Sequence, residues 1–361
     1  YLSREEKLKI IANFKSIGAA NFDWQELLPN EHGDWIAMRN DDFSEFIPIA
    51  AESKFDEKSQ SFFLVHSLGI ASSRDSWVYN ASSKKIEQSM RSMIDFYNQQ
   101  RTSFKEAQSK NLKLEFQDFA STDLSKINWN DSLQALCAKN VELSFLQNEM
   151  RVGNYRPFFK SSFYFDRDFI QRPYQIPKLF PKAGIENLVI CVSGVGVTKD
   201  FSCIITDIIP DLELIGKSQC FPLYYYEERK KNAPGLFDEG DSELVRHDGV
   251  SDWIHAQAKT RYGSQVTKED VFYYVYGFLH HPAYRETFAA DLKKMLPRLP
   301  LVERVEDFWA FSRAGRQLAD LHLNYETIGQ PPEIMVTYAP ALTVNYRVEK
   351  MRFLSKTDKS R

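Results

Sequence analysis

The sequence predicts a mixed α/β (α+β) protein in which a twisted, largely antiparallel sheet is flanked by helices and preceded by a helical connector region. Three observations predict this class. Short apolar segments separated by turn residues follow one another in the middle of the chain, helical spacing dominates the last third, and one long helical pattern precedes both. A chain of 361 residues can bury a sizeable core without disulfides.

The first part of the chain, to about residue 121, is predicted to mix helices with loops. Residues 3–14 have a capped helical start, because Ser3 is followed three residues on by Glu6, the pattern of a capping box. A buried strand is predicted over residues 62–70, and the polar residues after it form a turn: Ser72, Ser73, Arg74 and Asp75. Residues 84–114 are predicted to form one long helix, which suits a connector between domains.

The rest of the chain is predicted to change from strands to helices. A second helix is expected over residues 131–148. Short strands, mainly antiparallel because the turns between them are short, are expected at residues 187–192, 201–205, 212–215 and 219–226. Residues 230–252 are polar and are expected to form a mobile loop. Three helices and a final strand are expected at residues 268–280, 282–296, 305–321 and 346–353.

The segment RVGNYRPFFKSSFYFDRDFIQRPYQIPKLFPKAG, residues 151–184, interleaves basic and aromatic side chains. Its seven basic residues face two acidic ones, so the segment carries 7 − 2 = +5, while the whole chain carries −3. A groove that contacts a polyanion needs this combination, since guanidinium groups neutralise phosphates and aromatic faces stack on bases. The alternative is that the aromatic residues are the core of two short strands and the arginines are solvated.

Composition excludes several classes of protein. The net charge of −3 and an isoelectric point near 6.2 argue against a protein that coats nucleic acid or membranes indiscriminately, so a DNA contact is expected to be local. Four cysteines without a CxxC pair indicate a reduced, cytoplasmic protein and no zinc site. No apolar run reaches the roughly 18 residues of a spanning helix, which favours a protein without a membrane partner. A start at Tyr1 and an end without a closing element suggest a piece of a longer protein.

Three motifs resemble functional sites and have simpler interpretations. The segment VSGVGVTK, residues 192–199, lacks the third glycine of a nucleotide-binding loop and is predicted to be a hairpin turn. Asp211 and Glu213 after Pro210 suggest a metal-dependent nuclease, yet no lysine stands two residues after Glu213, so a structural turn followed by a strand is expected. His280 and His281 precede Pro282 and are expected to cap a helix end, because adjacent side chains diverge on a helix.

Four blocks resemble the C-terminal target-recognition region of type ISP restriction-modification enzymes, which are single-polypeptide relatives of type I enzymes. The blocks are YRPFFKSSFYFDRDFIQRPYQIPKLFP, ITDIIPDLELIGKSQCFPLYYY, VFYYVYGFLHHPAYRETFAADLKKMLPR and FWAFSRAGRQLADLHLNYE. The earlier segment GIASSRDSWVYNASSKKIEQSMRSMIDFYN is similar to the part of that family that joins the adenine methyltransferase to the recognition domain. The resemblance implies a division into residues 1–121, the end of the methyltransferase and a helical coupler, and residues 122–361, the specificity domain.

The resemblance implies an intact bacterial enzyme that carries a nuclease, a helicase-like motor, an N6-adenine methyltransferase and a recognition domain, and that uses S-adenosylmethionine, ATP and Mg²⁺. The chain has no Asn-Pro-Pro-Tyr motif, no Walker A loop and no complete glycine motif for a cofactor, so it is expected to hold no catalytic, cofactor or metal site. Its expected partners are double-stranded DNA and the methyltransferase and motor domains of the parent polypeptide.

Specific residues are expected to contact DNA. Within the basic segment they are Arg156, Lys160, Arg167, Asp168, Arg172 and Lys178. The turn of Ser72, Ser73 and Arg74 lies where related methyltransferases place a loop beside the flipped base, although an ion pair of Arg74 with Asp75 or another acidic neighbour is an alternative. Two other functions remain open: a metal-dependent nuclease using Asp207, Asp211 and Glu213, and a protein-interaction module that does not touch DNA.

Overall fold

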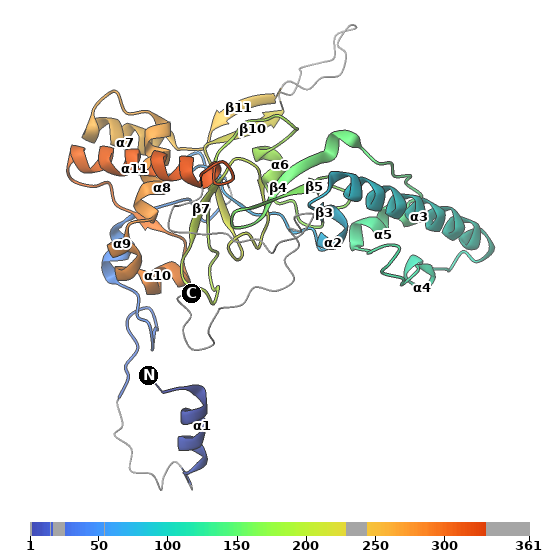
Figure 1. Ribbon diagram of the computed structural model, residues 1–361, viewed down its shortest axis with the longest axis horizontal. Helices are drawn as coiled ribbons and strands as arrows, with labels where there is room; N and C mark the ends of the chain where they lie inside the picture. Colours follow the sequence, from blue (N-terminus) through green and yellow to red (C-terminus); the bar gives the residue numbers. More distant parts are fainter. Residues whose placement is uncertain (1, 15, 17–25, 54, 229–243, 330–361) are drawn as a thin grey trace, which may run out of the picture. The chain divides into compact units, whose positions relative to one another are not determined.

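The computed structural model describes residues 2–14, 16, 26–53, 55–228 and 244–329. Internal contacts divide the chain into two units, residues 1–323 and 324–361, and the architecture below is that of the first. Helices and strands are interleaved along it, so the predicted mixed class is confirmed (Figure 1). In place of one sheet, the described strands form two four-stranded and two two-stranded sheets.

The central sheet is antiparallel throughout. Strand β6 (Val189–Val192) lies between β7 (Cys203–Thr206) and β9 (Gln219–Pro222), and β2 (Ser67–Leu68) pairs with the far side of β9. Residues 193–202 connect β6 to β7, and Gly196 has a positive φ of 75° there, so the predicted hairpin turn is confirmed.

Both faces of the central sheet are buried, each in a different core. Ile190 and Val192 belong to one core, whereas Val189 and Cys191 belong to the other. Successive side chains of a strand point to opposite faces, so a strand with two buried faces has a continuous apolar sequence. This explains why β6 reads VICV and β7 reads CIIT.

The second four-stranded sheet contains the first part of the basic aromatic segment, up to Tyr164. Strand β5 (Phe159–Tyr164) lies between β3 (Tyr79–Asn80) and β4 (Met150–Arg156), and β8 (Ile209–Pro210) pairs with β4 in parallel. The two small sheets join β1 (Ile47–Pro48) to β12 (Arg298–Leu299) and β10 (Tyr224–Glu228) to β11 (Leu244–Asp248).

The long predicted helix is confirmed as α3 (Ser83–Lys110), which begins after the N-cap Ser82. Its buried face carries six residues at helical spacing: Ile86, Met90, Met93, Ile94, Tyr97 and Phe104. It packs against α5 (Asp131–Ala138), and the Tyr97 hydroxyl donates to the Val141 carbonyl beyond α5 at 2.9 Å (Figure 1).

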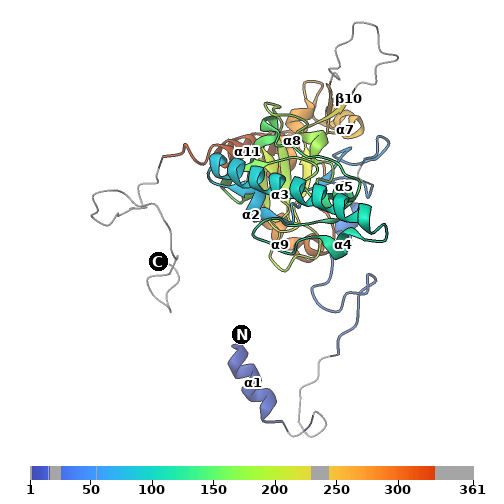
Figure 2. The ribbon, with the colours of Figure 1, turned by 90° about the vertical axis from the view of Figure 1, so that its right-hand side faces the viewer.

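Helices α8 (Lys268–Leu279) and α11 (Val305–Leu323) pack closely because each carries a glycine at the contact (Figures 1 and 2). A Cβ atom on Gly315 would lie 2.0 Å from the Tyr273 carbonyl oxygen, and one on Gly277 would lie 2.3 Å from that of Phe311. The remaining helices are α1 (Arg4–Ala12), α2 (Asp75–Val78), α4 (Phe116–Phe119), α6 (Ile176–Leu179), α7 (Asp252–Tyr262), α9 (Pro282–Thr287) and α10 (Ala289–Lys294), with 3-10 turns at Asp41–Glu45 and Gln147–Glu149.

Helix α1 has the predicted capping box: Ser3 accepts from the Glu6 amide, and the Glu6 carboxylate accepts from the Ser3 amide at 2.7 Å. None of its residues is buried, so the apolar side chains of this helix contribute no core. The predicted cap at the C-terminus of α8 is confirmed for His280. His281 instead is the N-cap of α9 and accepts from the Tyr284 amide.

The predicted helix over residues 131–148 is wrong in length, because α5 ends at Ala138. Asn140 adopts a left-handed conformation (φ 60°), and the amides of Asn140 and Val141 donate to the carbonyls of Cys137 and Leu136, both at 2.9 Å. This pair of bonds is a Schellman motif, which satisfies the last carbonyls of the helix and turns the chain away.

Several other predicted elements differ from the structure. Residues 212–215 form a turn, because the Asp211 carboxylate accepts from the Glu213 amide at 2.9 Å. Residues 62–70 pair with several different segments and include only the short strand β2 among the described strands. Phe288 divides residues 282–296 into α9 and α10, residues 244–248 are strand β11, and α7 was not predicted. The strand predicted over residues 346–353 lies outside the described residues.

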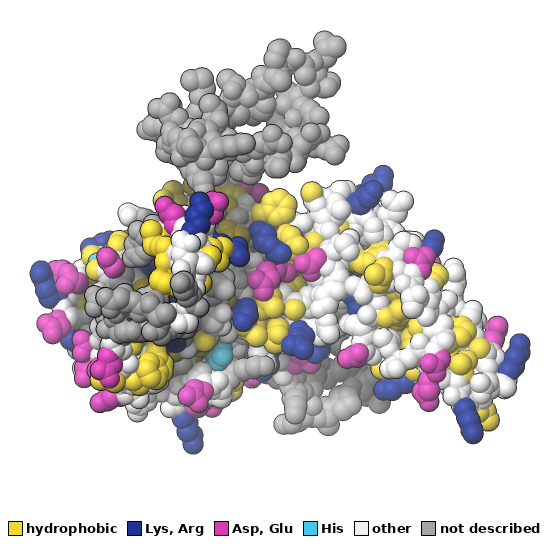
Figure 3. Space-filling model, turned by 90° about the horizontal axis from the view of Figure 1, so that it is seen from below, with side chains coloured by type: hydrophobic (Ala, Val, Ile, Leu, Met, Phe, Trp, Pro, Cys, Tyr) yellow, Lys and Arg dark blue, Asp and Glu magenta, His cyan; other side chains and the backbone are white. Residues whose placement is uncertain are grey.

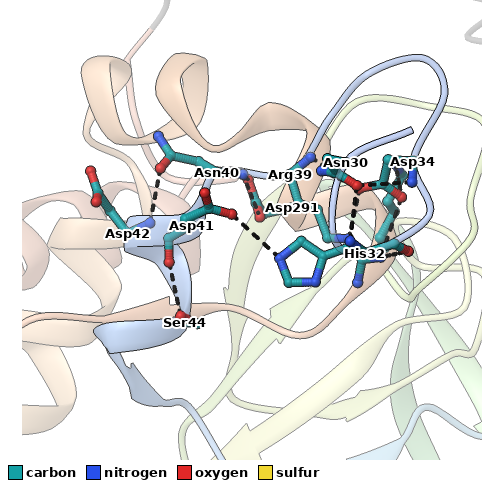
Figure 4. Close-up of polar contacts among 10 residues, drawn as sticks. Asn30, His32, Asp34, Arg39, Asn40, Asp41, Asp42, Ser44 and Asp291 are labelled. Carbon is teal, nitrogen blue, oxygen red and sulfur yellow. Dashed lines mark hydrogen bonds and ion pairs between the residues drawn. The ribbon is translucent and has the colours of Figure 1, made fainter. Parts of the chain in front are cut away.

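The N-terminal segment is held against α10 by a polar cluster (Figure 4). The buried Asp34 carboxylate contacts Arg39 Nε at 2.9 Å and Lys294 Nζ at 2.8 Å. The Asn40 amide donates to both carboxylate oxygens of Asp291, at 3.2 and 3.1 Å. These bonds attach residues 30–40 to a helix near the other end of the unit.

Candidate nucleic-acid interface

A β-bulge in β4 places Arg156 on the same face of the second sheet as Arg151. Strand β4 pairs regularly with β5 up to Asn154, and the register then shifts by one residue before Arg156. As a result Arg151, Gly153 and Arg156 all stand opposite alternate residues of β5 and lie on one face. The turn that follows contains Phe158 in a left-handed conformation (φ 54°).

The predicted alternative, in which the aromatic residues are core residues of short strands, holds for part of the segment. Five of the nine aromatic residues in the segment are buried: Phe163, Tyr164, Phe165, Phe169 and Phe180. Phe158 and Phe159, at the tip of the hairpin, are 45% and 49% exposed. The hairpin therefore has an apolar base and an aromatic tip on the surface.

Backbone pairing brings three of the predicted DNA-contacting segments side by side. Ala71 and Arg172 exchange two backbone hydrogen bonds of 3.0 Å. On the other side, the Ile70 amide donates to the Pro210 carbonyl at 3.0 Å, and the Asp211 amide donates to the Asn154 carbonyl of β4 at 3.1 Å. The order across the molecule is thus Arg172, the 69–72 segment, the 209–212 segment and β4.

Side chains join the 72–75 turn to the end of β4. The Tyr155 hydroxyl donates to Asp75 Oδ2 at 3.0 Å, and the Ser72 hydroxyl donates to Asp75 Oδ1. Arg156 Nη1 contacts Asp211 Oδ1 at 3.0 Å, and its guanidinium carbon lies 3.8 Å from the centre of the Tyr155 ring. We call these five residues the Arg156 cluster.

Burial sets the electrostatics of the cluster. It raises the pKa of Asp211 to about 6, and the nearby Asp75 carboxylate adds to the rise while Arg156 opposes it. Burial also raises the pKa of Tyr79 well above its usual value; its ring stacks on Phe163 at 4.3 Å. The Arg156 side chain is 40% exposed, whereas that of Asp211 is 5% exposed. The cation of the pair is therefore accessible from solvent and the anion is not.

Arg74 is 3% exposed, and neither Nε nor Nη1 has a hydrogen-bond partner among the described residues. The predicted alternative, an ion pair with Asp75, is wrong, because no ion pair joins Arg74 to a described carboxylate. Burial lowers the pKa of this guanidinium to about 10. Ser73 is exposed with φ 57°, and its carbonyl accepts from Asn128 at 3.0 Å.

The other predicted contact residues are spread along the segment. Arg167 and Arg172 are exposed. Asp168 is half-buried, and its amide donates to Asp166 Oδ1 at 2.9 Å. Lys160 Nζ donates to the Leu323 carbonyl at 3.3 Å, and Lys178 Nζ lies 3.6 Å from a Glu227 oxygen. None of these five residues belongs to the Arg156 cluster.

The residues proposed for a nuclease site are not grouped around one point. Asp211 contacts Arg156, while Asp207 and Glu213 are exposed. Within the described ranges, no group of three or more His, Cys, Asp or Glu residues is arranged to hold a metal ion.

A cleft of about 1120 Å³ opens beside the start of β4. Its lining includes three basic residues, Arg151, Lys182 and Arg246, and two acidic ones, Glu186 and Asp207. Arg246 stacks on the Tyr224 ring at 4.3 Å, and no sequence motif indicated it. The face in Figure 3 has the same character: basic and acidic side chains are interspersed over its described surface, with apolar ones between them.

Comparison with solved structures gives close matches in fold. The chain aligns over 99% of its length with a nuclease-deletion mutant of the type ISP restriction-modification enzyme LlaGI in complex with a DNA substrate mimic (31% identity, TM-score 0.76, 25% of that chain). It aligns over 99% with the ATP-dependent type ISP enzyme LlaBIII bound to DNA (32% identity, TM-score 0.77, 21% of that chain). A DrdV–DNA complex matches 91% of the chain (28% identity, TM-score 0.74, 30% of that chain).

A mixed sheet-and-helix unit of this kind is the fold of a restriction-modification specificity domain. The sequence matches the family model described as type ISP C-terminal specificity domain over residues 61–361, and the chain belongs to that family. It spans less than a third of the length of each solved relative above. Curated protein sequences give no match. None of the described helices is both long and apolar enough to span a membrane.

Proposed function

We propose that this chain is the target-recognition part of a type ISP enzyme, which binds duplex DNA and positions a specific site for N6-adenine methylation and restriction. The observation that carries the proposal is its alignment, over 99% of its length, with two type ISP enzymes that are bound to DNA or to a DNA mimic. The basic aromatic segment of the sequence indicates the same partner.

The geometry supports a local contact. Arg172, the 72–75 turn and the Arg156 cluster lie on neighbouring paired segments, and both Arg156 and Arg172 reach the surface. Guanidinium groups clamp phosphates or read guanine bidentately. We assign Arg156 to the DNA backbone and Arg167 and Arg172 to the backbone or to base edges. Arg74 is buried, so its role is to support the turn beneath Ser73.

The partners and cofactors of the parent enzyme belong to the same proposal. We infer that methyltransferase and motor domains lie elsewhere in the parent polypeptide, together with the sites for S-adenosylmethionine, ATP and Mg²⁺, and that the enzyme works in the bacterial cytoplasm. One observation favours an additional docking role: Trp35, Ile36 and Met38 are 57%, 77% and 48% exposed beside the anchored Asp34. An anchored segment that presents large apolar side chains suits a contact with another domain.

Salt dependence of DNA binding tests the proposal. Affinity of the full 361-residue chain for a duplex should fall with salt at a slope of about −0.9 in log–log terms per phosphate neutralised. Replacing Arg156, Arg167 and Arg172 with Ala should make the slope less steep by about 2 to 3 units. Replacing three exposed lysines at and just after the end of α3, Lys105, Lys110 and Lys113, serves as the control for lost charge. Absence of duplex binding at low salt overturns the proposal.

A further inference from the structure

Arg156 is held on two sides. Its guanidinium lies 3.8 Å above the Tyr155 ring and 3.0 Å from Asp211. The ring is itself fixed, because the Tyr155 hydroxyl donates to Asp75 and the ring packs at a tilt of 44° against Tyr79, with centroids 4.6 Å apart. The orientation of this cation is thus set by residues from the 72–75 turn, β3 and the 209–212 segment.

The Asp211 carboxylate depends on Arg156 for charge compensation. Its side chain is 5% exposed, and its hydrogen-bond donors are Arg156 Nη1 and the Glu213 amide. The other charged or titratable groups around it are Asp75, Tyr79 and Tyr155, which supply no second cation. A buried carboxylate whose cation is withdrawn is left with an uncompensated charge.

We propose that Asp211 is a positioning residue that competes with a DNA phosphate for the guanidinium of Arg156. This inference rests on the proposed function, because it assumes that Arg156 contacts the DNA backbone. In the free protein Asp211 holds Arg156 toward the surface. In the complex the phosphate takes over part or all of the charge-assisted hydrogen bonding.

The competition makes DNA binding depend on pH. Burial raises the pKa of Asp211 to about 6 while Arg156 opposes the rise, so loss of Arg156 to a phosphate raises the pKa further. The complex therefore takes up a proton at Asp211, and the affinity must increase as the pH falls toward about 6 and level off below it. The expected loss of affinity between about pH 6 and pH 7.5 is about 3- to 10-fold.

The variant Asp211→Asn distinguishes two roles of Asp211. In one it competes with a DNA phosphate for Arg156, and in the other it only supports the Arg156 side chain. The amide cannot be ionised, so this variant should bind a duplex several-fold more tightly than wild type at pH 8 and should lose the pH dependence. Glu213→Gln is the matched control, since Glu213 carries the same charge two residues away on the surface. It should shift the affinity equally at all pH values. Binding is measured by fluorescence anisotropy with a labelled duplex at constant ionic strength.

Arg156→Ala gives a second readout that does not depend on the folding of the Asp211 variant. It should weaken binding and also remove the pH dependence. A pH dependence that Asp211→Asn leaves intact overturns the inference, as does weaker binding of a folded Asp211→Asn protein at pH 8. If Arg156→Ala keeps the affinity and the pH dependence of wild type, the inference fails while the proposed function stands on the other arginines. If wild type binds no duplex, both fail.

Discussion

Asp34 and Lys294, from opposite ends of the described chain, form an ion pair of 2.8 Å. The same carboxylate contacts Arg39, whose guanidinium is the largest influence holding the pKa of Asp34 far below its usual value, followed by Lys294. The N-terminal segment is thus fastened to α10 by one carboxylate that serves two cations.

Asp34→Asn should lower the melting temperature by loosening this attachment. The pKa of Asp34 is depressed in the folded state, so its contribution to stability is fully present above its unfolded pKa of about 3.9 and is lost as the pH falls through the lower folded value. The melting temperatures of variant and wild type should therefore differ most at pH 7, and the difference should shrink as the pH falls below about 4. Asp41→Asn, whose side chain is 83% exposed, is the control and should change little.

Gly315→Ala should destabilise the protein by about 1 to 3 kcal/mol or more, because the added methyl group would overlap the Tyr273 carbonyl and force α11 away from α8. Urea unfolding followed by circular dichroism gives the free energy of unfolding. Ala314→Ser, at the neighbouring exposed position, should cost about 0.5 kcal/mol or less. Equal stability of Gly315→Ala and wild type would show that the two helices separate without cost.

Base reading is expected from at least one of Arg167 and Arg172. A bidentate contact to a base edge contributes about 1 to 3 kcal/mol of discrimination, whereas a phosphate contact weakens all sequences alike. Once the cognate site is known, Arg167→Ala and Arg172→Ala are compared on cognate and single-base variant duplexes. Loss of preference at one position supports direct readout. Uniform loss in both variants means that they hold the backbone and that sequence is read in loops around Lys199 or residues 230–246.

Methyl transfer by the chain alone is expected to be absent. The motifs that would hold a flipped adenine and the methyl donor do not occur in its sequence. Incubation with labelled S-adenosylmethionine and DNA should leave no label on the DNA above background, and no strand cleavage should follow with Mg²⁺. Turnover in either assay would contradict this assignment of the chain as a recognition part.

The sequence correctly predicted those elements that depend only on residues close together in the chain. The capping box of Ser3 and Glu6, the apolar stripe of α3 and the apolar runs of β6 and β7 are each contained in a few neighbouring residues. The end of α5 was missed because Asn140 in a left-handed conformation is compatible with a helix until the Schellman bonds form. Likewise the apolar run of residues 212–215 reads as a strand, and only the Asp211 side chain makes it a turn.

The sequence predicted which segments form the candidate interface, but it did not predict which residues of these segments contact one another. The basic aromatic run indicated Arg156 and Arg172, and the polar turn indicated Ser72, Ser73 and Arg74. Asp211 was considered as a metal ligand, yet its contact is with Arg156, which is 55 residues away in sequence. Pairs at such separation are set by strand pairing, here β4 with β8, and no local spacing encodes them. The assignment of individual residues to DNA stays a prediction.

The strand β6 belongs to two cores at once, and this restricts how recognition regions can be exchanged between related enzymes. Its alternate residues pack with partners that include Phe62 on one side and Met90 on the other, both from the first third of the chain. In a chimaera joined at residue 121, β6 would come from one enzyme, whereas Phe62 and Met90 would come from the other. The side chains of β6 would then pack poorly in both cores. Exchange of DNA specificity by recombination is expected to succeed when the crossover falls before the segment containing Phe62, or when it replaces only surface loops.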